Sequence, residues 1–201
     1  MDKIIRKYFP DLDQDQQAKI AQLGELYNDW NSKLNLISRK DMDHFYERHV
    51  LHSLGIAKVC NFNAGCSIVD VGTGGGFPGI PLAIVYPEAK FHLVDSIAKK
   101  LRAVDEIVAA LGLKNVTTQQ SRIEDINHQF DYSVSRAVAR MLSFYRWVQP
   151  QIKPGGTMLY LKGGDIEDEM KELNKPYKVY ELQDFFKEKF FETKKVVRVE
   201  V

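Results

Sequence analysis

The sequence predicts an α/β fold: a mainly parallel sheet covered by helices on both faces, preceded by a helical extension over residues 1–62. Three observations support it. From Ser67 onward, short β-rich runs alternate with helical stretches, a glycine cluster follows the first run, and the earlier apolar residues recur at helical spacing. Such alternation is typical of parallel sheets, whose strands need crossover connections. We expect one domain over residues 1–201, with its core over residues 63–201.

Two helical stretches are predicted in the N-terminal extension. The first presents an apolar face whose members are three or four residues apart, namely Ile20, Leu23, Tyr27, Trp30 and Leu34. Asp13 and Gln16 have the spacing of a capping box at its start. After a loop over Asn35–Lys40, the second helical stretch is expected over Asp41–Val59.

Seven strands are predicted after the extension. The first five are Ile68–Val71, Phe91–Asp95, Asn115–Gln119, Phe130–Val134 and Thr157–Leu161. Helices are expected between or after them at Ile80–Val85, Ala98–Leu111, Leu142–Val148 and Asp165–Leu173. The last two β-rich stretches, Tyr177–Phe186 and Lys194–Val201, are predicted to pair as a closing hairpin.

Composition narrows the class of protein. The chain has 201 residues, 44% of them hydrophobic and 27% charged, with a net charge of +1. These values are typical of a globular domain and do not by themselves indicate a nucleic-acid partner. We find no apolar run long enough for a membrane span and no signal peptide. Cys60 and Cys66 fit neither a disulfide framework nor a four-ligand metal site. We expect a cytoplasmic protein, a monomer without a metal.

The glycine cluster predicts a ligand-binding loop. Five glycines lie between Gly72 and Gly79, around Phe77 and Pro78. Glycines let the backbone turn sharply and approach a ligand without a Cβ in the way. The helix that follows is expected to present free N–H groups to that ligand. A tight turn that binds nothing is the alternative, but so many glycines are costly for a turn alone.

Two cofactors fit this loop. Ligands of open α/β sheets bind at the carboxyl ends of the strands, where Asp95 follows Gly72 by 23 residues. An acid there accepts the ribose hydroxyls of either NAD or S-adenosylmethionine, and the glycine pattern alone does not separate them. Asp70, expected at the mouth of the loop, would repel a pyrophosphate and attract a sulfonium. Pro78 also removes a backbone donor that a phosphate would use. These two residues favour the methyl donor.

The methyl acceptor is less constrained. Both cysteines precede the loop, which disfavours attack by a pyrimidine C5, and Ser133–Ala137 lacks the motif usual for exocyclic amines. A ring nitrogen such as guanine N7 fits better, because it needs alignment with the sulfonium rather than a base. Between Lys99 and Lys162 there are ten basic and five acidic residues. This local balance of +5 favours a polyanion such as RNA, although a solvated surface would show it too.

The chain resembles the GidB (RsmG) family of bacterial small-subunit ribosomal RNA guanine-N7 methyltransferases. The longest matching stretch is DVGTGGGFPGIPL, Asp70–Leu82. The other matching stretches are Asn35–Leu36, Arg48–Ser53, Leu93–Ser96, Lys99–Lys100, Gln120–Glu124, Ser135–Ala137 and Leu161–Gly163. The resemblance implies a Rossmann-like class I methyltransferase that transfers a methyl group from S-adenosylmethionine to N7 of a guanosine in 16S ribosomal RNA.

The resemblance and the residue arguments above together give roles for individual residues. Those predicted to bind the cofactor are Asp70, Gly72, Gly74, Phe77, Asp95, Ser96, Ile123, Glu124 and Arg136. Ile123 and Glu124 would flank the adenine, and Arg136 would lie beside the acceptor. On the RNA side we expect Arg48, His49, Arg140 and Lys162. No catalytic base is named. The chain departs from the family at His52, where an acid is usual, and at Gly75, where alanine is frequent.

Two other functions stay open on the sequence alone. One is an NAD-dependent oxidoreductase, because the glycine pattern also suits a dinucleotide. The other is a module that binds an adenosyl ligand or RNA without catalysis. The particular guanosine and the form of the RNA substrate, naked or assembled, are not encoded in any motif that we recognise.

Overall fold

The computed structural model describes residues 2–201, without the side chain of Arg39, and contains a seven-stranded sheet of order β3-β2-β1-β4-β5-β7-β6. The strands are β1 Ser67–Val71, β2 Lys90–Asp95, β3 Val116–Gln120, β4 Phe130–Arg136, β5 Ile152–Gly163, β6 Tyr177–Glu181 and β7 Lys194–Glu200. The first five are mutually parallel, and β7 runs antiparallel to both β5 and β6. The predicted α/β sheet with its closing hairpin is therefore confirmed.

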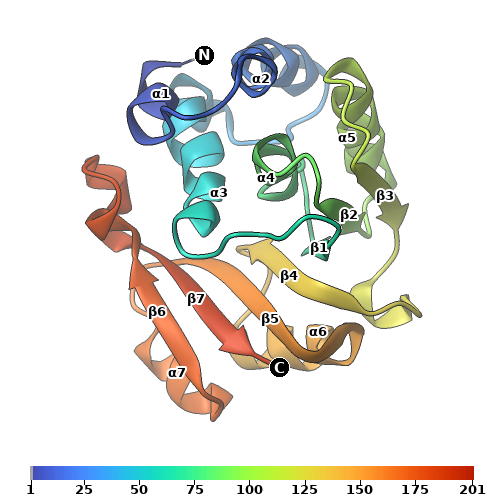
Figure 1. Ribbon diagram of the computed structural model, residues 1–201, viewed down its shortest axis with the longest axis vertical. Helices are drawn as coiled ribbons and strands as arrows, with labels where there is room; N and C mark the ends of the chain where they lie inside the picture. The colour runs from blue at the N-terminus through green and yellow to red at the C-terminus, as the bar shows by residue number, and fades with distance from the viewer. Residues whose placement is uncertain (1) are drawn as a thin grey trace.

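Helices cover both faces of the sheet (Figure 1). On one face, α4 (Gly79–Val85) and α5 (Ala98–Ala110) pack with the N-terminal segments in one apolar cluster. On the other face, α6 (Met141–Val148) and α7 (Glu167–Leu173) pack in a second cluster. Alternate strand residues supply the two clusters, since successive side chains of a strand point to opposite faces.

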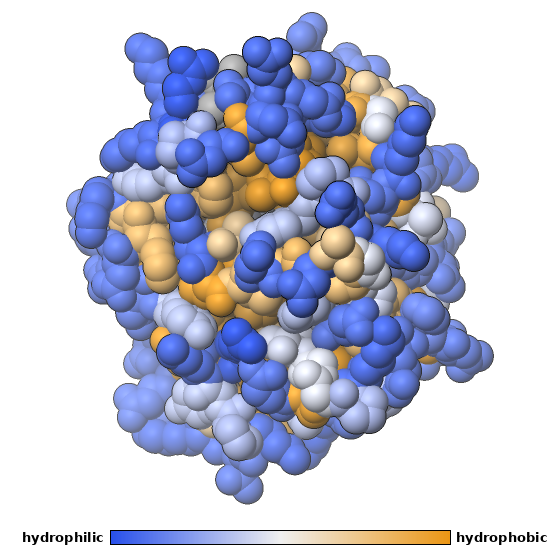
Figure 2. Space-filling model, in the orientation of Figure 1, coloured by the Kyte–Doolittle hydropathy of each residue, from blue (hydrophilic) through white to orange (hydrophobic). Residues whose placement is uncertain are grey.

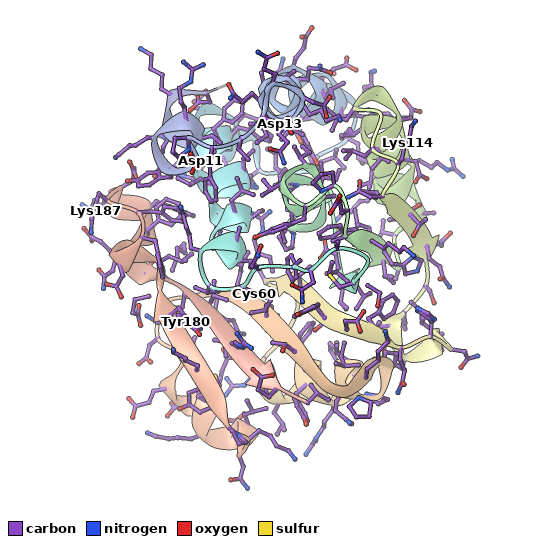
Figure 3. All side chains as sticks on the ribbon, viewed as in Figure 1. Asp11, Asp13, Cys60, Lys114, Tyr180 and Lys187 are labelled. Atoms are coloured by element: carbon purple, nitrogen blue, oxygen red, sulfur yellow. The ribbon has the colours of Figure 1, made fainter. Side chains whose placement is uncertain are left out.

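The N-terminal segment consists of several short helices around one long helix. They are α1 Lys3–Tyr8, α2 Gln14–Lys33, η1 Arg39–His44, η2 Tyr46–Leu51, α3 His52–Leu54 and η3 Ile56–Lys58. The capping box of α2 is confirmed: the Gln16 N–H donates to the Asp13 carboxylate at 2.8 Å, and the Asp13 N–H donates to the Gln16 side chain at 2.9 Å. Figure 3 labels Asp13 at this helix start.

The second predicted helical stretch is helical but not a continuous α-helix. It passes from 3₁₀ geometry in η1 through a π-helical turn in η2 to a short α-helical turn. A π-helical turn is rare and often marks a functional site. This turn carries Arg48, whose side chain is half-buried, and His49, whose side chain is buried.

The C-terminal stretch differs from the prediction in one respect. The strand β6 ends at Glu181, and the residues up to Phe186, which we expected to extend it, include the 3₁₀ turn η6 (Leu182–Asp184). A further 3₁₀ helix, η7 (Lys189–Thr193), leads into β7. The segment between β6 and β7 packs against α1, because the Lys187 N–H donates to the Tyr8 hydroxyl at 2.8 Å (Figure 3 labels Lys187).

The surface is mixed in polarity. Figure 2 shows apolar residues gathered around α3 and α4 on the viewed face, surrounded by hydrophilic residues. Within the described range 2–201, no helix combines the length and apolar content needed to cross a membrane.

Two further 3₁₀ turns complete the list of elements, η4 at Ile123–Asp125 and η5 at Gln149–Gln151.

Candidate functional site

A cavity of about 390 Å³ opens at the carboxyl ends of β1, β2 and β4, within the size range of small-molecule sites. Its lining residues lie at or just after the ends of β1 to β4, or on α5, α6 and η4. They are Val71, Gly72, Val94, Asp95, Ser96, Ile97, Lys100, Ser121, Arg122, Ile123, Glu124, Val138 and Trp147. This is the edge at which ligands of open α/β sheets bind.

Asp95 connects the cavity wall to the glycine loop. One carboxylate oxygen of Asp95 accepts from the Gly74 N–H at 2.8 Å, and the other accepts from the Ile97 N–H at 2.9 Å. Each oxygen keeps a second lone pair. The Gly72 and Thr73 N–H groups donate to the Val94 carbonyl at 2.8 and 3.0 Å. The end of β2 therefore fixes the loop that follows β1.

Only glycine fits at position 72 without a clash with the segment after β4. Its φ is +67°, and a Cβ at this position would lie 2.6 Å from a methyl carbon of Val138. Val138 belongs to the segment after β4, in which Ala137 also has a positive φ of +54°. The buried Tyr160 hydroxyl holds this segment by accepting from the Val138 and Ala139 N–H groups at 2.8 and 2.7 Å. The close approach of the two loops forms the inner wall of the cavity.

Large apolar side chains at the cavity are unusually exposed. Four large apolar residues of the described chain are at least 38% exposed, and three of them, Ile97, Val138 and Trp147, line this cavity. Exposed apolar surface in a concave site favours a planar apolar ligand group such as a base. Sequence reasoning missed these three residues. For Trp147 a signal existed, since it lies off the helical stripe formed by Met141, Phe144 and Val148.

The predicted cofactor residues fall into two groups. Gly72, Asp95, Ser96, Ile123 and Glu124 line the cavity, and Gly74 is hydrogen-bonded to Asp95 at its edge. The other three, Asp70, Phe77 and Arg136, lie outside the lining set and beneath or beside the loop.

The expected position of Asp70 was wrong. Asp70 is fully buried, and one of its oxygens accepts from the Thr73 hydroxyl at 2.6 Å and from the Gly79 N–H at 2.8 Å. Burial raises its pKa to about 7, although these hydrogen bonds oppose the shift. The side chain therefore stabilises the loop from below and does not stand at its mouth. The Gly79 N–H that donates to Asp70 is the first of α4, and we expected this N–H to be free for a ligand.

Phe77 and Arg136 form a second group with the N-terminal segment. Phe77 is 2% exposed, and its ring centroid lies 4.8 Å from that of Tyr27. The Arg136 guanidinium lies 5.0 Å from the Phe77 ring, donates to the Arg48 carbonyl at 3.3 Å and contacts the His49 ring nitrogen at 3.1 Å. The Arg136 side chain thus points to the N-terminal helices and not into the cavity, contrary to the expectation.

Burial and charge set the protonation of this group. Burial, with the positive charge of Arg136, lowers the pKa of His49 to about 3. Burial lowers the pKa of Arg136 to about 10, with Asp70 opposing the shift. At neutral pH the imidazole is therefore neutral and accepts a hydrogen bond from a charged guanidinium.

Arg140 and Lys162 are already paired. Arg140 is exposed and lies 2.8 Å from the Glu172 carboxylate. The Lys162 side chain is only 9% exposed, lies 2.7 Å from the Glu169 carboxylate and donates to the Ala139 carbonyl at 2.9 Å. Lys162 thus supports the segment after β4 from inside, which differs from the RNA-facing position that we expected.

A second cavity, of about 450 Å³, lies between α1, α2 and η1, away from the strand ends. Its acidic wall includes Asp2, Asp43 and Glu47. Across residues 2–201, no group of three or more His, Cys, Asp or Glu side chains is placed to hold a metal ion. Because ligands of open α/β sheets bind at the carboxyl ends of the strands, the cavity there is the candidate site.

Solved methyltransferase structures share this fold. A structure described as a SAM-dependent methyltransferase from Aquifex aeolicus aligns with a TM-score of 0.60 at 18% identity, over 82% of this chain and 99% of that chain. TrmN from Thermus thermophilus aligns with a TM-score of 0.56 at 18% identity, over 75% of this chain and 47% of that chain. At these identities the likeness concerns the fold alone. The fold is that of the Rossmann-like class I methyltransferases.

The family follows from closer relatives. A model of the GidB family, described as rRNA small subunit methyltransferase G, matches residues 16–197. A protein named ribosomal RNA small subunit methyltransferase G from Christiangramia forsetii is 55% identical over 97% of this chain and 95% of its own length. One of the same name from Cytophaga hutchinsonii is 51% identical over 98% of both chains. The chain belongs to the GidB family, as the sequence motifs predicted.

Proposed function

We propose that the protein transfers a methyl group from S-adenosylmethionine to N7 of a guanosine in the RNA of the small ribosomal subunit. The observation that carries the proposal is the cavity at the strand ends, bounded by Gly72 and Asp95, in a chain of the GidB family. The relatives named above are ribosomal RNA methyltransferases by name, over nearly their whole length.

The cavity residues fit an adenosyl cofactor. The Asp95 carboxylate keeps lone pairs for two ribose hydroxyls, and Ser96 lies next to it at the cavity wall. Ile123, Ile97 and Trp147 offer apolar surface for an adenine ring. At Gly72 a side chain would fill the space between the two loops. Gly74, held by Asp95, and Glu124 complete the proposed cofactor set.

Little acid–base machinery is needed for this reaction. S-adenosylmethionine supplies a methyl group on a positively charged sulfur. Guanine N7 has a lone pair and no proton, so the nitrogen forms the new bond to carbon while the carbon–sulfur bond breaks, and no proton has to leave. The chain then contributes mainly by holding the two partners in line.

We place the RNA on the side of the N-terminal segment and the end of β4. Arg48 is half-buried at this edge, beside His49 and Arg136. Arg136 is proposed to position η2 against the end of β4 and not to contact the cofactor directly. Arg140, which is exposed although ion-paired with Glu172, remains a candidate phosphate contact, whereas Lys162 is proposed to support the segment after β4.

The experiment is methyl transfer to defined RNA. The protein is incubated with labelled S-adenosylmethionine and small ribosomal subunits that lack the modification, and modified nucleosides are mapped by mass spectrometry. We expect one N7-methylguanosine in 16S RNA. Running naked RNA beside assembled subunits identifies the substrate form. No label on either RNA, with intact cofactor binding, would instead support a binding module without catalysis.

The oxidoreductase alternative is not favoured. Membership of the GidB family disfavours it, whereas the charge argument from Asp70 no longer contributes, because that carboxylate is buried. Calorimetric titration separates the two: binding of NADH, and none of S-adenosylhomocysteine, would refute the methyl-transfer proposal. We further propose that the protein acts as a monomer in the cytoplasm, where light scattering after gel filtration and cell fractionation test the two points.

A further inference from the structure

Two cations from opposite ends of the chain lie against one aromatic ring. The Arg48 guanidinium, from η2, lies 5.8 Å from the ring centroid of Phe190, in η7. The Lys194 ammonium, at the first position of β7, lies 4.7 Å from the same centroid. The buried His52 ring packs edge-on against Phe190 at 5.4 Å. Figure 1 shows the orange segment that carries η7 beside the teal helix α3.

Negative charge is scarce around these two cations. Arg48 has one carboxylate partner, Asp41, at 2.7 Å, and its buried Nε has no hydrogen-bond partner among the described residues. Lys194 donates to the Thr193 hydroxyl at 3.0 Å, and no carboxylate of residues 2–201 lies within ion-pair distance of it. Partial burial, followed by the charge of Arg48, lowers the pKa of Lys194.

The neighbouring groups do not compensate this positive charge. His49 and His52 are neutral, because burial and the charge of Arg136 lower their pKa values. The Nε2 atoms of both histidines are buried and lack a hydrogen-bond partner within the described chain. Three of the six such side-chain atoms therefore come from Arg48, His49 and His52, on consecutive turns of one segment.

The cation pair lies at the same edge of the sheet as the cavity. Lys194 is paired with Gly163, the last residue of β5. The Arg48 carbonyl accepts a hydrogen bond from Arg136, the last residue of β4. Since β4 and β5 are parallel neighbours, both cations lie near the carboxyl ends of the strands. An RNA that presents a base to the cavity would pass close to them.

We propose that Arg48 and Lys194, which both contact the ring of Phe190, bind phosphates of the substrate RNA. The inference rests on the proposed function and extends it to residues of η7 and β7, which the sequence motifs did not indicate. Phosphate groups are acceptors that match a guanidinium and an ammonium, and they would offset the repulsion between the two cations. Cation–π contact with the Phe190 ring holds both side chains in place.

The test compares neighbouring lysines of β7. Lys194→Ala removes one proposed contact, whereas Lys195→Ala is the control, because the Lys195 ammonium lies 2.7 Å from Glu181 and is already neutralised. Binding of a 16S RNA fragment is measured from low to high salt, and S-adenosylhomocysteine binding is measured beside it. For Lys194→Ala we expect about threefold weaker RNA binding and a slope of log affinity against log salt smaller by about one. Cofactor affinity should stay unchanged.

Further variants sharpen the outcome. Lys194→Arg should restore the salt slope, and combining Lys194→Ala with Arg48→Ala should lower it by about two. An unchanged slope in Lys194→Ala, or an equal change in Lys195→Ala, overturns the inference while wild-type methyl transfer leaves the proposed function standing. A wild-type protein that neither labels nor binds the RNA overturns both.

Discussion

The hydroxyl of Tyr27, in the middle of α2, donates a hydrogen bond of 2.5 Å to the carbonyl oxygen of Gly75, in the centre of the glycine loop. Both residues are buried, and burial raises the pKa of Tyr27, so the hydroxyl keeps its proton. The same ring packs against Phe77. The N-terminal helix therefore fixes the loop from outside the sheet, while Asp95 and Asp70 fix it from within.

Replacing Tyr27 with phenylalanine should loosen this connection. Tyr27→Phe keeps the ring but leaves the buried Gly75 carbonyl without its donor, so we expect the unfolding free energy to fall by about 1–3 kcal/mol. Urea unfolding measures it. Tyr145→Phe is the control, because no hydrogen bond of the Tyr145 hydroxyl occurs in the described part of the chain. Equal losses in both variants would show that the connection is not specific.

The sequence predicted the sheet well because its signals were local. Alternation of β-rich runs with amphipathic helices, the capping box of α2 and the glycine loop each depend on residues close together in the chain. The strand β6 was predicted too long at Tyr177–Phe186, because aromatic and apolar residues favour strands. In the structure Leu182 is buried from the 3₁₀ turn η6, and Phe186 is buried from the loop after it.

The site was predicted only in part, because it depends on which face of a strand a residue occupies. Asp95 ends β2 at the cavity, as expected. Asp70 and Arg136 carry the charges expected of a site, yet Asp70 is buried under the glycine loop and Arg136 faces η2, whose packing no local pattern specifies. Lys194 and Phe190 come close to Arg48 only through the geometry of the C-terminal hairpin, which no local pattern reveals.

Gly72→Ala tests the close approach of the two loops. We expect a strong loss of cofactor affinity, because a Cβ would lie 2.6 Å from a Val138 methyl group and the positive φ disfavours alanine. Gly65→Ala is the matched control: its φ is +78°, but a Cβ there meets no atom within 4 Å. Calorimetric titration with S-adenosylhomocysteine should separate them. Equal affinity in the two variants would refute the proposal that the loop at Gly72 forms a wall of the cofactor cavity.

Trp147→Ala tests the apolar wall. If the exposed indole packs on the adenine, its loss should weaken S-adenosylhomocysteine binding by about 1–3 kcal/mol, the usual effect of removing an aromatic from a base. Tyr177→Ala removes a comparably exposed aromatic ring from β6, outside the lining set, and should leave the affinity unchanged. Unchanged binding in Trp147→Ala would remove this residue from the site.

Asp95→Ala tests the ribose contact and the loop anchor together. Loss of the carboxylate removes charged hydrogen bonds, so we expect S-adenosylhomocysteine binding to weaken by about 1–3 kcal/mol. Asp105→Ala removes an exposed carboxylate of α5 that bonds only to Thr118 among the described residues, and it should bind normally. Should Asp95→Ala also bind normally, Asp95 does not contact the cofactor.

Asp70→Asn tests the buried carboxyl through the pH dependence of stability. Between its ordinary pKa of 3.8 and its folded pKa of about 7, Asp70 keeps its proton in the folded protein and loses it in the unfolded chain. Its contribution to stability is therefore full below about pH 4 and lost as the pH rises through about 7. Because asparagine cannot ionise, the unfolding free energy of Asp70→Asn relative to wild type should rise by about 1.4 kcal/mol per pH unit across this window and then level off.

The matched control for this pH profile is Asp131→Asn. The pKa of Asp131 is about 2, because partial burial, which raises it, is outweighed by hydrogen bonds from Lys153 and Ser67. Its contribution is therefore lost only as the pH falls through about 2, and the difference between Asp131→Asn and wild type should stay constant above about pH 5. Urea unfolding from pH 5 to 8.5 measures both profiles. A flat profile for Asp70→Asn would mean that Asp70 has the same pKa in the folded protein and in the unfolded chain. Burial beneath the glycine loop would then not raise the pKa of this carboxyl.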